Sequence, residues 1–147
     1  MLDGKLYYPY NTVEESAVRG MVSFDDFKAT DDSPLYVQIL RHIRHGIAAG
    51  TISDGDALPS RRVLSATLGI NPNTVQRAYR ELEEDGLVNN HSGAKSCMVL
   101  SDAAVERVRR ELVESELRSM ARTLRTAGVS KDEAKELLER FWEEDET

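Results

Sequence analysis

Residues 58–88, LPSRRVLSATLGINPNTVQRAYRELEEDGLV, contain two short helical patterns separated by a tight turn. The first helix is predicted to start at Ser60, whose hydroxyl can cap the free amides of the first turn, and to end at Gly69. Its apolar side is short and consists of Val63, Leu64 and Leu68.

The second pattern has its own start signal, with Asn71 as N-cap and Pro72 at the first helical position, where a missing N–H costs nothing. It stops at Gly86, after which the chain becomes extended. The apolar face of this helix consists of Val75, Ala78, Tyr79 and Leu82. Two short helices joined in this way form a helix-turn-helix.

Polar side chains of the kind that contact nucleic acid lie off this apolar face, near the start of the second helix. Arginine can pair with guanine, and asparagine or glutamine with adenine, in a major groove. An ordinary solvated face would also be polar, but here the acidic run at 81–85 begins only at the far end of the helix, which leaves positive charge at the near end. The predicted DNA contacts on the two helices are Arg61, Arg62, Asn73, Thr74, Gln76, Arg77 and Arg80.

Four stretches of the sequence, in the same order, resemble the winged-helix domain of GntR-family transcription regulators. They are PLYVQI at 34–39, LPSRRVL at 58–64, NPNTVQRAY at 71–79 and LEEDGLV at 82–88. The similarity covers residues 33–100, and the short tail resembles the small YtrA-like subfamily. The resemblance implies a homodimer that binds double-stranded DNA at an operator of two inverted half-sites, usually as a repressor.

The same resemblance implies a wing, and the sequence after Gly86 fits one. Two short strands, at 87–88 and 97–100, are predicted to be joined by residues 89–96, and the family has a short strand before the helix-turn-helix that pairs with the wing. The family usually has an arginine and two glycines in the wing, whereas this chain reads GAKSCMV at 93–99. His91 and Lys95 remain as candidate phosphate contacts.

The remaining helices are predicted from apolar spacing and end signals. A helix that opens at Ser33 and Pro34 and stops at Gly50 should pack behind the helix-turn-helix. Residues 102–126 form a long amphipathic pattern, and Ser130 with Glu133 forms a capping box for a last helix, which predicts an antiparallel helix pair. So small a tail cannot bury both apolar sides on itself, so we expect it to dimerise. The predicted dimerisation residues are Leu112, Leu117, Met120, Leu124, Leu138, Phe141 and Trp142.

The predicted fold is mostly α with a small β-hairpin: a winged helix-turn-helix followed by the helix pair. We expect a loosely ordered N-terminal arm at 1–32, with a short extended or helical piece at 21–27 that could dock on the body, a winged-helix domain at 33–100 and a helical tail at 101–147. The net charge of the chain is −7, and that of residues 34–99 is +1, so the predicted DNA-binding segment is the least acidic.

Several functions are excluded or disfavoured by what the sequence lacks. The single cysteine, Cys97, allows no intrachain disulfide, and no apolar run is long enough for a membrane span, so we expect a cytoplasmic protein. His42 and His45 have no third ligand nearby, so neither a metal nor another cofactor is predicted. The 47 residues after Leu100 cannot hold a catalytic domain, and no nucleophile–base pair is evident, so we do not expect an enzyme.

The leading functional hypothesis is a dimeric, sequence-specific DNA-binding transcription regulator. The alternative is a winged-helix protein-interaction module that has lost DNA binding, which the altered wing and the acidic flanks would fit. An unknown small-molecule effector would have to bind between the winged helix and the tail. The sequence leaves the operator and the role of the N-terminal arm open.

Overall fold

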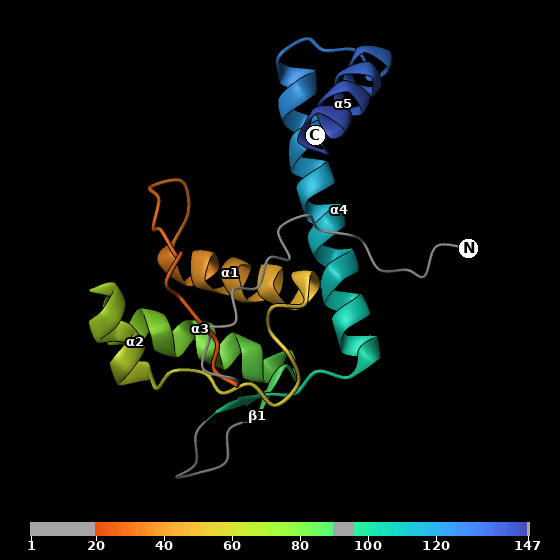
Figure 1. The fold of residues 1–147 in the computed structure, drawn as a ribbon. Helices are drawn as coiled ribbons and strands as arrows, with labels where there is room; N and C mark the ends of the chain where they lie inside the picture. Colours follow the sequence, from red (N-terminus) through yellow and green to blue (C-terminus); the bar gives the residue numbers. More distant parts are fainter. Residues whose placement is uncertain (1–19, 90–95, 147) are drawn as a thin grey trace. The chain divides into compact units, whose positions relative to one another are not determined.

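The computed structural model describes residues 20–89 and 96–146 of the 147-residue chain. The described residues form two compact units, one up to residue 109 and the other from residue 110 onward. Figure 1 follows the chain through its helices and the two short strands. The helices and strands of the first unit, apart from the start of α4, are α1 (Leu35–Ala49), α2 (Arg61–Leu68), α3 (Pro72–Glu84), β1 (Val88–Asn89) and β2 (Cys97–Met98).

The two helices of the helix-turn-helix begin at the caps that the sequence predicts. The Ser60 hydroxyl accepts a hydrogen bond from the Val63 amide at 3.1 Å, and the Asn71 side chain accepts one from the Asn73 amide at 2.9 Å. Gly69 ends α2 in the left-handed conformation, with φ of 64°, which a residue without Cβ adopts without strain. These local signals therefore fix where α2 stops and α3 starts.

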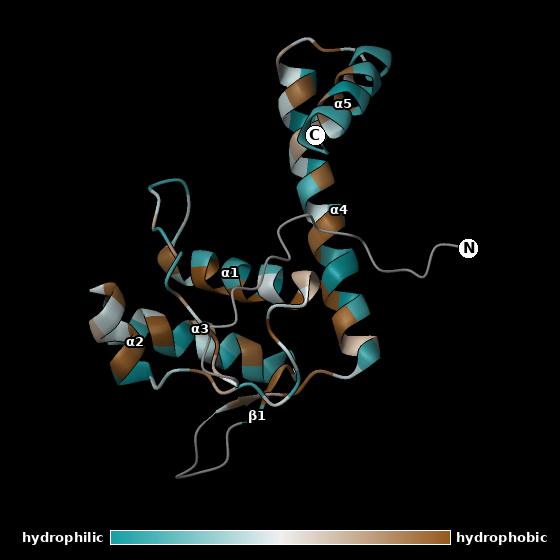
Figure 2. Ribbon diagram, in the orientation of Figure 1, coloured by the Kyte–Doolittle hydropathy of each residue, from teal (hydrophilic) through white to brown (hydrophobic). Residues whose placement is uncertain are grey.

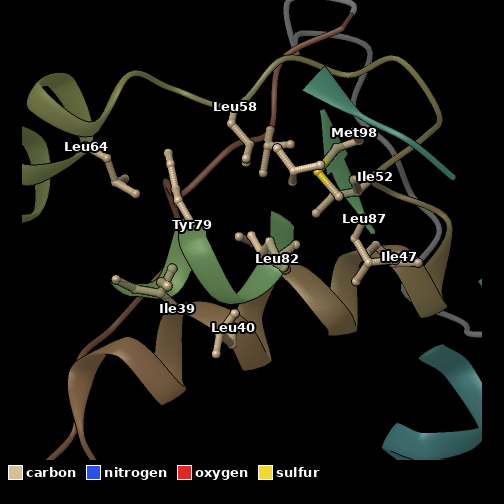
Figure 3. Packing of buried hydrophobic residues seen from close by; sticks show 14 of the residues in the cluster. Ile39, Leu40, Ile47, Ile52, Leu58, Leu64, Tyr79, Leu82, Leu87 and Met98 are labelled. Carbon is tan, nitrogen blue, oxygen red and sulfur yellow. The ribbon is translucent and has the colours of Figure 1, made fainter. Parts of the chain in front are cut away.

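The core lies where α1 and α2 pack against the apolar face of α3, closed by the wing and the loop at 51–59 (Figure 3). Leu82 and Val75 of α3 are fully buried, as are Ile39 and Ile43 of α1. Val63 is the exception to the predicted pattern, because 55% of its surface is exposed. It lies about 100° around α2 from the buried Leu64, and α2 contacts α3 along one narrow side only.

Residues 20–32, which the sequence assigned to a loosely ordered arm, contribute to this same core. Val22 and Phe24 are buried in it, and the Phe24 ring stacks on His42 of α1 with 4.7 Å between ring centres. Met21 forms a parallel bridge with Ala57, and the Val22 amide donates to the Ala57 carbonyl at 2.9 Å. The piece at 21–27 is therefore an extended segment docked on the body, the first of the two forms considered.

The wing strands are antiparallel, with Val88 opposite Met98 and Asn89 opposite Cys97. The strand expected before the helix-turn-helix is reduced to a single antiparallel bridge between Ala57 and Cys97. The second strand is shorter than predicted, because the Leu100 amide donates to the Asp54 carboxylate at 2.8 Å and leaves the ladder. Residues 90–95, at the tip of the wing, lie outside the described residues.

The C-terminal helices are α4 (Asp102–Thr126) and α5 (Lys131–Asp145), so the predicted long helix at 102–126 is confirmed. The first residues of α4 belong to the winged-helix unit, where Val108 is buried. The Ser130 hydroxyl accepts from the Glu133 amide at 3.1 Å, which confirms its role as N-cap of α5. A short turn reverses the chain, so that α5 runs back beside the end of α4 (Figure 1). None of the described helices is long and apolar enough to cross a membrane.

Candidate nucleic-acid interface

The exposed side of α3 carries the predicted base-reading residues. Asn73, Arg77 and Arg80 are exposed and recur at helical spacing along one line of the helix, with Gln76 and Thr74 partly buried on either side of it. The positive end of the helix dipole lies at the same end of α3 as Asn73 and adds to its attraction for phosphate. The structure therefore brings these five residues together on one surface.

Arg77 is held in place by two neighbours, although its side chain is 61% exposed. Its guanidinium carbon lies 3.7 Å from the centre of the Tyr36 ring, and Nη2 donates to the Tyr36 hydroxyl at 3.0 Å. Its Nε lies 3.8 Å from Oε1 of Glu81, one turn further along α3. The guanidinium is thus oriented before any DNA arrives.

The Arg61 side chain, on α2, is more buried than that of Arg77. Its Nη2 lies 3.2 Å from Oε1 of Glu83, its guanidinium carbon lies 5.5 Å from the centre of the Tyr79 ring, and its buried Nε has no hydrogen-bond partner among the described residues. The Tyr79 hydroxyl donates to the Pro59 carbonyl at 2.7 Å, and burial raises the pKa of this phenol. Tyr79 therefore fixes the segment from which α2 starts, and Arg61 rests on its ring.

Arg62 and Arg80 differ from these two arginines. Both are exposed, and neither forms an ion pair or hydrogen bond with any residue in the described part of the chain. Such side chains are free to turn toward phosphate oxygens. The remaining candidates, His91 and Lys95, lie outside the described residues.

The acidic end of α3 is partly neutralised by neighbouring elements. The Asp85 carboxylate lies 2.7 Å from Nη2 of Arg44 on α1, and its carbonyl accepts from Arg107 of α4 at 3.2 Å. The Asp85 carboxylate is thus directed into a contact with another helix. The exposed cations of this helix, Arg77 and Arg80, lie in its middle part, before the acidic end.

The predicted dimerisation residues are largely exposed in the second unit. Figure 2 shows hydrophobic colour along α4 and α5 among hydrophilic stretches. No residue of α5 is buried, and 60% of Trp142 and 51% of Phe141 are exposed. Leu117, Met120 and Leu138 are also exposed, while Leu112 and Leu124 are half-buried.

Some partners of the arginines were missed by the sequence reasoning. Glu81 could have been found from its position four residues after Arg77 on the same helix. Tyr36 could not have been found from the sequence, because its distance to Arg77 depends on how α1 packs against α3. Within the described residues, no cluster of three or more His, Cys, Asp or Glu could hold a metal ion.

Comparisons with known proteins agree with this geometry. The family model of bacterial regulatory proteins of the gntR family matches residues 35–96. The chain is 28% identical to the HTH-type transcriptional regulator YhcF of Bacillus subtilis, over 80% of this chain and 98% of that protein. It is 37% identical to the HTH-type transcriptional repressor YtrA of Bacillus subtilis, but over only 50% of this chain and 54% of that protein.

Solved structures show the same architecture. A GntR family transcriptional regulator from Listeria monocytogenes superposes with a TM-score of 0.68 at 28% identity, over 76% of this chain and 98% of the other. A transcriptional regulator from Oenococcus oeni gives a TM-score of 0.59 at 27% identity, over 81% and 99% of the two chains. The helix-turn-helix and the two-stranded wing of the present chain, together with these matches, show that this chain belongs to the GntR family of DNA-binding transcription regulators and is not an enzyme.

Proposed function

We propose that this regulator represses transcription as a homodimer bound to an operator of two inverted half-sites. Each copy would place the start of α3 in a major groove. A two-fold symmetric protein matches an inverted repeat, and the distance between the two α3 helices then sets the half-site spacing. The repressor role is favoured by the similarity to YtrA, which is described as a repressor.

The arrangement of α3 supports sequence-specific contacts. Gln76 and Arg77 lie near the start of the helix and carry groups that read adenine and guanine edges. Arg62 and Arg80 are exposed cations without a partner among the described residues, which suits contacts to phosphates. Together these residues would supply both the position and the specificity of the complex.

The observation that best supports the proposed dimer is the exposed apolar surface of the tail. Phe141 and Trp142 are more than half exposed on a helix without a single buried residue, and Leu117 and Met120 are exposed on α4. Large aromatic side chains contribute much of the binding free energy of an interface when a partner covers them. A second copy of the same tail would supply that partner, since a two-fold interface places the same patch on both sides.

The test combines two measurements on the purified full chain. Light scattering gives its mass in solution, and sequencing of bound genomic fragments gives its preferred DNA. We expect a mass of two chains and an enriched inverted repeat. A folded dimer that enriches no DNA sequence would instead support the protein-interaction module, and a monomer at micromolar concentration would contradict the proposed role of the tail.

Repression itself needs a separate readout. A reporter gene placed behind the enriched sequence should be expressed less when the chain is present. The matched control is a chain with Arg77→Ala and Arg80→Ala, which keeps the buried core and the tail but loses the exposed arginines of α3. Equal or higher expression with the unaltered chain would contradict repression while leaving DNA binding intact.

A further inference from the structure

Tyr36 is not one of the predicted DNA contacts, yet it holds one of them. The Arg77 guanidinium lies against the Tyr36 ring, Nη2 donates to the Tyr36 hydroxyl, and Nε faces the Glu81 carboxylate. The plane of the guanidinium and two of its three nitrogens are therefore engaged by residues of two different helices. Nη1 forms no hydrogen bond with any described residue.

The Tyr36 ring is itself held by the fold. Tyr36 lies on α1, is partly buried, and packs against the hydrophobic core between α1 and α3. Its position therefore follows the packing of the whole unit rather than the freedom of a surface side chain. A ring fixed in this way can fix the arginine stacked on it.

Arg80 provides an internal comparison. It is exposed near Arg77 on the same side of α3, but no described residue forms a hydrogen bond or ion pair with its side chain. A free arginine loses rotamer freedom when it binds, whereas a preorganised one has lost that freedom already. The two arginines should therefore differ in how strictly they select a base.

We propose that Tyr36 is a positioning residue for base reading by Arg77, and that the base is a guanine. A guanidinium held in one plane can direct two N–H groups at O6 and N7 of guanine, which is the common bidentate contact of arginine in the major groove. Tyr36 touches no base in this arrangement and acts through the arginine. This inference rests on the proposed function, since it concerns how the same surface selects DNA.

The experiment measures discrimination, the ratio of Kd for a one-base-pair variant of the enriched operator to Kd for the operator itself. Arg77→Ala first identifies the base pair at which Arg77 acts. Tyr36→Leu and Tyr36→Phe are then measured at every position, alone and together with Arg77→Ala. Thermal unfolding of each variant shows whether it is folded.

We expect Tyr36→Leu to lower discrimination about three- to tenfold at the base pair read by Arg77 and at no other position. Tyr36→Phe keeps the stacked ring and loses the hydroxyl contact, so it should lose less. In the Arg77→Ala background, Tyr36→Leu should change nothing at that position. Arg77→Lys should lose discrimination there despite its retained charge, because lysine lacks the planar fork.

Three results would overturn the inference. If Tyr36→Leu weakens binding to all sequences alike, Tyr36 has a structural role only. If Arg77→Ala loses discrimination nowhere, Arg77 reads no base, although enrichment of an inverted repeat would still uphold the proposed function. If the unaltered chain enriches no sequence at all, the proposed function fails and this inference fails with it.

Discussion

The winged-helix unit and the helical tail use amphipathic helices in opposite ways. In the winged-helix unit, Ile39 and Val75 are fully buried because α1 and α2 cover the apolar side of α3. In the tail, Phe141 and Trp142 are more than half exposed, although their helix is equally regular. The spacing of apolar residues tells where a helix has an apolar face, but not which surface covers it. We infer that the first unit is stabilised by its own core, and the tail by a second copy.

The largest expected effect is a difference in unfolding free energy between the same kind of substitution in the two units. Leu82→Ala removes a fully buried side chain from α3 and should lower the free energy of unfolding by about 2–5 kcal/mol. Leu138→Ala, the matched change on α5, removes a side chain that is 43% exposed in the single chain, and should cost far less at a protein concentration low enough for single chains to prevail. Chemical denaturation measures both, and equal losses would contradict the comparison.

The next effect concerns association. Trp142→Ala should weaken the dimer by about 2–4 kcal/mol, because interface aromatics of this kind carry much of the binding energy. Sedimentation at several concentrations measures the shift, while circular dichroism should show an unchanged helical content in the winged-helix unit. Glu136→Ala lies on the opposite side of α5 and is the control. If both variants dimerise as the unaltered chain does, Trp142 is not an anchor.

A smaller effect separates the two kinds of arginine within the first unit. Arg77→Ala should cost about 1–3 kcal/mol on the preferred operator and relax preference at one base pair. Arg80→Ala should weaken binding to all sequences alike and reduce the dependence on salt, because its lost contact is to a phosphate. Titrations at several salt concentrations distinguish them. Identical behaviour of the two variants would show that the Tyr36 contact has no consequence for selection.

The smallest expected effect compares the two serine caps. Ser60→Ala removes the acceptor for the first turn of α2 and should cost about 1 kcal/mol of stability of the winged-helix unit. Ser130→Ala removes the corresponding acceptor for α5. Because α5 is expected to be held by the partner, this second change should appear mainly as weaker dimerisation. Denaturation at two protein concentrations checks it: the Ser130→Ala loss should depend on concentration, and the Ser60→Ala loss should not.

Much of the fold follows from short-range signals. Asn71 with Pro72 and Ser130 with Glu133 mark helix starts within a few residues, and the long helix at 102–126 follows from its apolar spacing. These features depend on neighbours along the chain. The same spacing misplaced Val63, because a narrow contact with α3 covers only one side of α2.

Other features depend on contacts between distant residues. The sequence indicated that the piece at 21–27 could dock on the body, but not the bridge between Met21 and Ala57 or the burial of Val22 and Phe24, since these depend on how the first unit packs. The stack of Arg77 on Tyr36 joins residues that are 41 positions apart. The candidate DNA contacts could therefore be placed on the right helices from the sequence, but not their partners.

The most direct test of the account is the mass of the complex with the enriched operator, measured by native mass spectrometry for the unaltered chain and for Trp142→Ala. We predict two chains on an operator with both half-sites, and single chains on the same operator when the tail contact is weakened. Two chains bound in both cases, with equal affinity, would contradict the claim that the exposed tail of this regulator joins the two copies.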